Sequence, residues 1–376
     1  MPSYAGEVES TEKDTVIVPL YYHSESMEHT FGVAGVTKGV GQDQGVLFGT
    51  ALYSTNESYV GFFSANNYKL TDDFLFSARA QKARFNGNTY YLGEDGKNDS
   101  DGVGVITDGL ETKLTASFRY VLPLGENSSP DQDISLFGRE VVGSLPFNSG
   151  ITTLGVSPFY TSREVESINE DASSTGFTLS FDWDNRDSVR LATKGSHTSF
   201  DLTFGSSDWG SDETWSIWEL SNSQFFDIGP LSNIFEKQVI GFDFYLADTP
   251  TWDSSRPPEH DQVSLGGLYK LRSYTGNRFH GRSAIHYSAE YRVMPEWQPL
   301  NEIPYLDYYQ IPWWQWVAFV DVGRVADDFN LETLHEDMQW SVGAAVRFQI
   351  EGIVVRTEVA RGSEEGLLRV MINQPF

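Results

Sequence analysis

The chain has 376 residues, no cysteine and a formal net charge of −27, from 53 acidic and 26 basic residues. The lack of cysteine excludes disulfides and thiolate metal sites, and it suits a chain that crosses an oxidising compartment unfolded. The acidity argues against nucleic acid and anionic surfaces as partners. No window of eighteen apolar residues occurs, so the sequence predicts no transmembrane helix.

The length suits one closed barrel, because strands can be added around a circumference. We expect a short tail at 1–14 and a single barrel domain over 15–376. The first residues lack the basic and apolar regions of a signal peptide. Because the rest of the chain favours export, we expect the numbering to start at the mature protein.

Period-two alternation recurs along the chain, separated by Gly, Asn, Asp and Ser clusters. In 339–350, for example, Trp340, Val342 and Ala344 oppose polar or small residues. A soluble sandwich would also alternate, but here one face is almost purely apolar and the other repeatedly carries charge or Gly. This pattern is typical of a barrel with lipid outside and a polar lumen.

The sequence therefore predicts an all-β fold, a transmembrane antiparallel β-barrel of sixteen strands. An even number is usual for single-chain bacterial barrels. The region 124–149 is compatible with a short interfacial helix or with an extra strand. The strands are expected near 15–22, 30–38, 45–54, 58–67, 74–83, 113–122, 151–160, 176–184, 197–205, 214–224, 238–247, 283–293, 315–325, 339–350, 353–361 and 366–376.

The last predicted strand carries Leu368, Val370 and Ile372 on one face and ends at Phe376. It resembles the terminal recognition strand of bacterial outer-membrane proteins, although Gln374 departs from the alternation. The resemblance implies an outer-membrane location and the barrel assembly machinery as a partner during biogenesis. Outer-membrane lipids and lipopolysaccharide would then surround the barrel.

The segment from Ser264 carries the most specific motif. Gly266 and Gly267 are followed by Leu271-Arg272-Ser273-Tyr274. This resembles the long extracellular loop of the BamA/TamA assembly superfamily, the bacterial surface antigen barrels, in which Gly-Gly precedes Val/Leu-Arg-Gly-Tyr/Phe. Ser273 stands where the family has Gly, and Ser adopts a positive φ only at a cost. The resemblance implies a loop, about 248–282, folded into the lumen.

Three further segments follow the family's order. Residues 288–292 resemble its twelfth strand and 319–323 its thirteenth. A turn similar to the family's periplasmic turn after the eighth strand carries Asp184, Arg186, Asp187 and Gly195, with Asn185 and Ala192 as departures. The similarity covers about 175–376, and barrel patterning alone supports the rest.

Alternation places Glu290 and Asp321 on the lumen side of neighbouring strands. Two such carboxylates are costly unless a cation lies between them, and the planar guanidinium of Arg272 can engage both. In relatives an Arg-to-carboxylate contact holds the loop inside the barrel, so the resemblance implies a lock of Arg272, Glu290 and Asp321. The alternative is that the carboxylates only neutralise lumen cations such as Arg347, Arg356 and Arg369.

Residues 294–316 are rich in aromatic side chains, and strand parity places them on the periplasmic side. They suit a segment lying in the membrane interface, either as an ordinary aromatic girdle or as a docking surface for a second copy or a periplasmic partner. The aromatic residues are Trp297, Tyr305, Tyr308, Tyr309, Trp313, Trp314 and Trp316.

Enzymatic motifs are absent from the sequence: it has no GxSxG, HExxH, P-loop or dinucleotide-binding glycine motif. We expect no catalytic residues, no cofactor and no metal site. His197 with Ser196 and Ser199 is a poor candidate for a lipase site at the lipid boundary. The acidic loop 94–101 fits a solvated loop better than a weak calcium site.

Three functions remain open at this point. The resemblance implies insertion or translocation of protein or lipid at the outer membrane. Relatives recruit clients through periplasmic POTRA domains, however, and only about 14 residues precede the first predicted strand. The alternatives are a gated conduit for small solutes or lipids, plugged by the loop, and an oligomeric structural barrel such as a homodimer.

Overall fold

The structure is a computed structural model. It describes residues 15–24, 27–125, 145–166, 170–229, 235–304, 306–309, 311–350, 353–364, 366–372 and 374–376. The expected tail 1–14, Tyr305, the side chain of Ile372 and most of the region 124–149 lie outside the described residues. Among the described residues, no helix is long and apolar enough to cross a bilayer.

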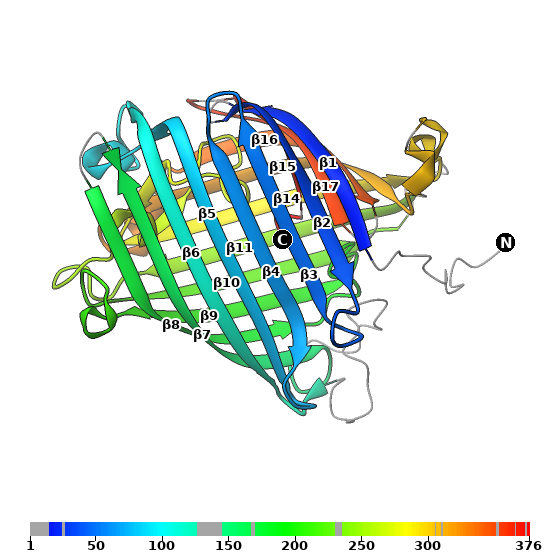
Figure 1. Cartoon of the computed structure of the whole chain (residues 1–376), viewed down its shortest axis with the longest axis horizontal. Helices are drawn as coiled ribbons and strands as arrows, with labels where there is room; N and C mark the ends of the chain where they lie inside the picture. The colour runs from blue at the N-terminus through cyan, green and yellow to red at the C-terminus, as the bar shows by residue number, and fades with distance from the viewer. Residues whose placement is uncertain are drawn as a thin grey trace.

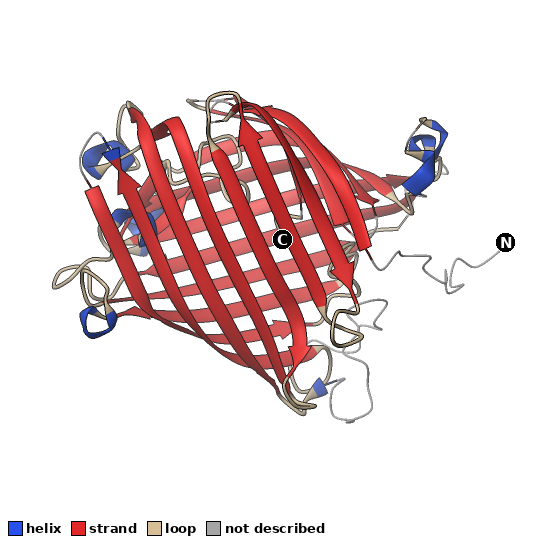
Figure 2. Ribbon diagram, in the orientation of Figure 1, coloured by secondary structure: helices blue, strands red, loops and turns tan. Residues whose placement is uncertain are grey.

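Sixteen antiparallel strands of the described residues form one sheet, with each strand next to its neighbour in the chain. The sheet curls into a barrel, and helical turns occur only in its connections (Figures 1 and 2). The strands are β1 (Thr15–Ser24), β2 (Glu28–Lys38), β3 (Val46–Ser54), β4 (Tyr59–Lys69), β5 (Phe74–Tyr90), β6 (Val105–Val121), β7 (Ile151–Val165), β8 (Glu170–Asp184), β9 (Gly195–Gly205), β10 (Trp215–Asp227), β11 (Phe235–Asp248), β14 (Ser283–Pro295), β15 (Trp314–Ala326), β16 (Gln339–Ile350), β17 (Ile353–Gly362) and β18 (Gly366–Ile372).

The remaining elements are short and lie in the connections. They are β12 (Val263–Leu265), β13 (Phe279–Gly281), η1 (Gly93–Gly96), η4 (Ser207–Trp209), η5 (Glu259–Asp261), η6 (Pro299–Glu302), η7 (Asp307–Tyr309) and α1 (Leu331–His335). The strands β12 and β13 pair with each other in a separate two-stranded sheet, and the other described strands all belong to the barrel sheet. The described residues therefore contain no separate periplasmic domain.

The sixteen predicted strands are confirmed in number and order. The main difference is length, since β5 continues to Tyr90 and β6 starts already at Val105. Some of the added outward residues are polar, such as Arg84, whose Nη2 lies 3.1 Å from Glu166 Oε1, while Ile106 is apolar and exposed. The register also shifts between Phe85 and Asn88, and such a bulge interrupts the alternation from which the strand ends were predicted.

Alternate connections of an up-and-down barrel lie at the same end. We call the end where β1 begins and β18 finishes the terminal rim; it also carries the connections 185–194 and 296–313. The opposite end, the loop rim, carries 91–104, 249–282 and 327–338. The strands β1 and β18 are the edges of the sheet and lie beside one another, but no ladder joins them within the described residues.

The polar lumen predicted from alternation is found along β5–β18 but not along β1–β4. Register places Asp182, Asp201, Glu219 and Asp243 inward on β8 to β11. The inward residues of β1 to β4 are mostly apolar instead, and so are the outward ones. The strands β1–β4 are therefore apolar on both faces. The alternation pattern was interpreted as one apolar face opposite a polar one, and it did not reveal this.

The long loop 249–282 lies inside the barrel, as expected from the resemblance. Its side chains build a buried cluster against β10, β11, β14 and β15. The members are Trp215, Ile217, Tyr245, Ala247, Val263, Leu265, Leu271, Tyr274, Phe279, Ala284 and Val325. Apolar burial thus holds the loop to one side of the lumen.

Candidate functional site: the lumen loop and its arginine network

The tip of the lumen loop turns sharply at two glycines. Gly266 and Gly267 have φ of 103° and 114°, and a Cβ on Gly266 would lie 2.4 Å from the Thr275 carbonyl oxygen. Both positions therefore need glycine. Ser273, where the family has Gly, is not at a positive φ; the left-handed residue is Leu271, with φ of 46°. The expected backbone cost falls on Leu271 and not on Ser273.

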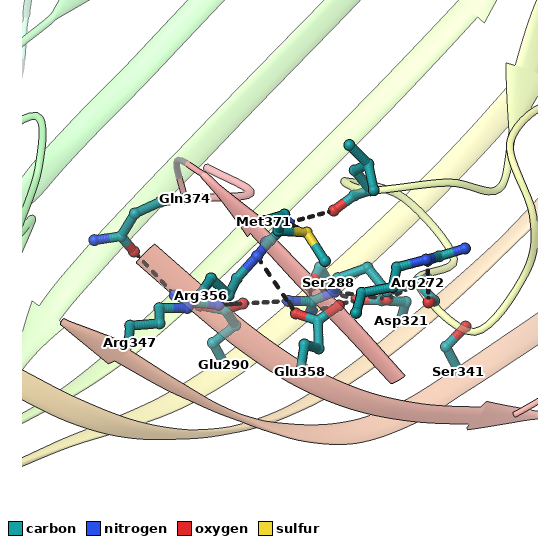
Figure 3. Close-up of polar contacts among 12 residues, drawn as sticks. Arg272, Ser288, Glu290, Asp321, Ser341, Arg347, Arg356, Glu358, Met371 and Gln374 are labelled. Carbon is teal, nitrogen blue, oxygen red and sulfur yellow. Dashed lines mark hydrogen bonds and ion pairs between the residues drawn. The ribbon is translucent and has the colours of Figure 1, made fainter. Parts of the chain in front are cut away.

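Arg272 is fully buried, and the structure brings it into contact with both predicted carboxylates (Figure 3). Its Nε and Nη2 donate to Asp321 at 3.0 and 2.7 Å, and its backbone N–H donates to the same carboxylate at 3.0 Å. Its Nη1 donates to Glu290 Oε1. The guanidinium carbon also lies 3.6 Å from the centre of the Phe319 ring. One side chain thus joins the loop tip to β14 and β15.

Glu290 also serves further arginines. Arg347 donates to it at 2.6 and 2.9 Å (Figure 3). Arg292 donates to it at 2.8 Å. The two readings of the sequence are therefore compatible at Glu290, which contacts both the loop arginine and lumen cations. Asp321 differs, because Arg272 is the cation with which it forms an ion pair.

Arginines on the last two strands contact the loop backbone, a role that was not predicted from the sequence. Arg369 on β18 donates to the carbonyls of Gly267, Arg272 and Tyr274 at 2.8, 2.6 and 2.7 Å. Arg356 on β17 donates to the carbonyl of Leu268 at 2.7 Å. The sequence predicted that these arginines face the lumen. It could not predict their bonds to loop carbonyls, because every residue has a carbonyl and the path of the loop decides which of them lie in reach.

Ser273 forms hydrogen bonds with Ser341 on β16. Its backbone N–H donates to Ser341 Oγ at 3.1 Å, and the two hydroxyls lie 2.7 Å apart. Its neighbour Tyr274 places its hydroxyl 2.9 Å from Ser363 Oγ. A Cβ on Gly362 would lie 2.4 Å from Ser273 Oγ, so a glycine on β17 makes room for the serine. The departure from the family motif thus has local partners.

A second group of contacts closes the loop rim. Arg278 is fully buried, and its Nε and Nη2 each donate to Glu364 at 2.7 Å. His280 Nε2 lies 2.9 Å from the Tyr91 carbonyl, and a Cβ on Gly96 would collide with the same ring. The connection 91–104 is therefore packed onto the lumen loop.

The acidic loop 94–101 is in part the solvated loop that was expected, since Glu94, Asp99 and Asp101 are exposed, but several of its residues also make contacts. Asp99 Oδ2 lies 3.1 Å from Arg324 Nη2, Lys97 pairs with Asp327, and Asn98 is buried. Among the described residues no group of three or more His, Asp or Glu side chains could hold a metal ion. His197 Nε2 lies 2.7 Å from Asp182 Oδ2 on the lumen side, away from the lipid boundary.

The turn after β8 is held by its own acidic residues. Asp184 receives Nε and Nη2 of Arg186 at 3.0 and 2.9 Å, and Asp187 accepts the N–H groups of Thr193 and Lys194 at 2.8 and 3.1 Å. Gly195 has φ of 92°, and a Cβ there would lie 2.3 Å from the Asn185 carbonyl oxygen. The four motif residues therefore meet in one turn.

The two departures in this turn also have local roles. The Asn185 side-chain oxygen accepts from the Ser196 N–H at 2.6 Å and from its hydroxyl at 2.9 Å. Ala192 is buried against Phe225 and Val239 at the terminal rim.

The end of the chain corrects the expected last strand. β18 finishes at Ile372 and not at 376, and Phe376 packs inside the lumen against Phe225, with ring centres 6.0 Å apart. Gln374 Oε1 accepts from Arg347 at 2.9 Å. A recognition role for Ile372 and Phe376 would act on the unfolded chain, so it stays a prediction.

The aromatic segment at the terminal rim forms a folded projection with η6 and η7, visible as the golden helical turns in Figure 1. Trp314 donates to the Trp297 carbonyl at 2.8 Å, and their ring centres lie 4.8 Å apart. Trp313 donates to Gln349 at 3.0 Å. Trp297, Tyr308 and Trp316 remain exposed over half or more of their surface.

Comparisons with known proteins agree with this architecture. No curated protein sequence matches the chain. Among solved structures, BamA from Haemophilus ducreyi lacking POTRA domains 1–3 superposes with a TM-score of 0.56 at 14% identity, over 96% of this chain and 70% of that chain. CdiB from Escherichia coli superposes with a TM-score of 0.57 at 11% identity, over 95% and 61%. CdiB from Acinetobacter baumannii superposes with a TM-score of 0.56 at 12% identity, over 96% and 59%.

These structural likenesses show the fold, and this chain spans about three fifths of the two CdiB chains. The family follows from the sequence itself, because the model of the Omp85 superfamily domain matches residues 39–351. BamA-type barrels are members of that superfamily. The chain therefore belongs to the Omp85 superfamily, as the lumen-loop motif indicated.

Proposed function

We propose that the chain acts in the insertion or translocation of protein or lipid at the bacterial outer membrane. Omp85 barrels are outer-membrane proteins, and the general class follows from the family match. The observation that most supports a role at the bilayer is the seam between β1 and β18, the two edge strands that no ladder joins within the described residues. Unpaired strand edges can pair with an incoming strand.

The lumen loop supports this function by holding the last strand in place. Arg272 ties the loop to β14 and β15, while Arg369 ties the loop backbone to β18. The seam strand β18 is thereby connected to β14 and β15 through the loop. We propose that Arg272, Glu290 and Asp321 lock the loop and so limit movement of β18.

The test is reconstitution of the chain into liposomes that then receive a small urea-denatured barrel protein. The wild-type chain is expected to speed insertion of the client, read by its heat-modifiable mobility on unboiled gels. The control is a variant with a longer connection between β10 and β11 at Gly229. This change leaves the seam unaltered, so the variant should insert the client at the wild-type rate. A rate equal to that of protein-free liposomes would contradict the proposal.

A gated conduit is the second candidate. It is supported by Arg79 and Lys113, which face the lumen on β5 and β6 and are exposed, so that this part of the lumen is accessible to solvent. Single-channel conductance that rises in Arg272→Met would favour this candidate. The loop would then act as the plug.

The exposed aromatic projection at 296–313 supports a contact with a second copy or a periplasmic partner. Its Trp297 and Tyr308 are exposed by 51% and 66%. Native mass spectrometry in mild detergent tests for a homodimer. We propose no enzymatic role, cofactor or nucleic acid partner. The barrel assembly machinery would act only during biogenesis, with outer-membrane lipids and lipopolysaccharide around the folded barrel.

A further inference from the structure

The inner face of β1–β4 forms a continuous apolar surface beside the seam, which we call the apolar lumen wall. Strand register aligns its residues in rows that run across the four strands. One row joins Val16, Val36 and Phe48, the next joins Val18, Ala34 and Phe62 through Thr50, and a third joins Leu20, Leu52 and Val60 through Gly32. The wall consists of these nine apolar residues.

The lumen loop does not cover this wall. The loop packs against β10, β11, β14 and β15, and the buried hydrophobic clusters of the described residues contain no wall residue. Val16, Ala34 and Val36 of the wall are buried. Phe48 and Phe62, with ring centres 5.9 Å apart, are only half-buried, like Val18 and Leu20. A contiguous apolar surface that stays partly exposed is typical of a binding site.

The apolar rows end at cations. The row of Val16, Val36 and Phe48 continues through Ser64 to Arg79 on β5, and the row of Val18 and Phe62 continues through Gln81 to Lys113 on β6. Adjacent strands lie about 4.8 Å apart, so Lys113 is roughly 10 Å from Phe62 and roughly 24 Å from Val18. Arg79 and Lys113 are exposed and form no ion pair with another described residue. The nearby Glu111 is already paired with Arg163 at 3.0 Å.

An apolar surface that ends at cations without an ion-pair partner in the described part of the chain matches the chemistry of an anionic amphiphile. A polypeptide strand fits less well, because the backbone groups beneath the wall are already paired within the sheet and offer it no ladder. The outer face of the same strands is also apolar, with Ile17 and Tyr21 of β1 exposed by 66% and 61%. Lipid could therefore pass the edge of β1 without leaving an apolar surface.

We propose that the apolar lumen wall binds the acyl chains of an anionic phospholipid, whose phosphate is held by Arg79 and Lys113. This inference rests on the proposed function for the membrane setting and names lipid as the cargo class. It does not depend on the lock at Arg272, whose carboxylate partners lie on β14 and β15.

The natural absence of cysteine permits single-site labelling without a background. Thr50→Cys places a fluorophore at the centre of the wall, and Ala51→Cys places it on the outer face of the same strand. The detergent-solubilised barrel is titrated with brominated phosphatidylglycerol, which quenches on contact. Quenching at position 50 is expected to saturate near one lipid per chain, while quenching at 51 rises with the mole fraction of lipid.

The headgroup is tested with Arg79→Gln combined with Lys113→Gln, which should weaken saturable quenching about tenfold, because charge-assisted contacts to the phosphate are lost. Lys82→Gln, an outward cation on the same strand, is the matched control and should leave it unchanged. Brominated phosphatidylcholine should bind more weakly. Heat-modifiable mobility shows that each variant is folded.

An unquenched label at position 50 would overturn the proposal. It would also be overturned if the two brominated lipids quenched equally and the double variant were quenched as strongly as the chain with Arg79 and Lys113 intact. Release of the bound lipid by a stoichiometric barrel-strand peptide would assign the wall to polypeptide and overturn it too. If the liposome insertion assay failed while saturable quenching persisted, the proposed function in protein insertion would be rejected and the lipid-binding proposal would stand.

Discussion

Replacing Arg272 with methionine should release the lumen loop. The substitution keeps much of the apolar stem but leaves Asp321 without its ion-pair partner, inside a site where both side chains are fully buried. Removing one partner of a buried pair typically costs about 3–5 kcal/mol. Because Glu290 keeps Arg347 and Arg292, most of this cost should arise at Asp321.

The assay is protease cleavage within 249–282 as a function of urea, in detergent. Arg282→Met is the matched control, because Arg282 pairs with Asp248 and Asp253 near the end of the same loop while 22% of its side chain is exposed. A partly exposed pair should contribute about 1 kcal/mol or less. Equal midpoints for the two variants would refute the reasoning.

The double variant Arg272→Met/Asp321→Asn sharpens the test. Asparagine removes the carboxylate that the single variant leaves uncompensated, so the double variant should recover about 1–3 kcal/mol relative to Arg272→Met. A double variant as unstable as the sum of the two single variants would show that the two side chains do not act together.

Three further predictions concern other parts of the barrel. Gly195→Ala should lower the urea midpoint more than Gly229→Ala, because both have a positive φ but only Gly195 lacks room for a Cβ; equal effects would contradict this. Phe376→Ala should widen the terminal rim and raise single-channel conductance, since its ring lies inside the lumen; unchanged conductance would place it outside the ion path. Burial lowers the pKa of His260, so the unfolded segment takes up protons more readily, and protection of 256–262 from protease should fall between pH 7.5 and about 5.5. His260→Gln should weaken that pH dependence, and the remainder is expected from His280, whose pKa is also lowered by burial and whose Nδ1 lies 3.0 Å from Gln262 Oε1.

The sequence by itself determined the strands. Sixteen segments with period-two alternation became sixteen strands in the predicted order, because one face of each must meet lipid and the pleat has a period of two. It also placed Glu290 and Asp321 on the lumen side, since parity sets which side chains of β14 and β15 point inward, and the resemblance of the loop motif added Arg272 as their partner. These features could be predicted because they depend only on the alternation of side chains along a single strand.

Only the tertiary structure decided the rest, because those features depend on which distant groups meet. The carbonyl contacts of Arg369 require the path of the loop past β18. The inward turn of Phe376 depends on a lumen-facing Phe225 more than a hundred positions earlier. The apolar lumen wall arises from register across β1–β4, which no single strand reveals. Contacts between segments far apart in the chain are set by packing, and packing leaves no periodic trace in the sequence.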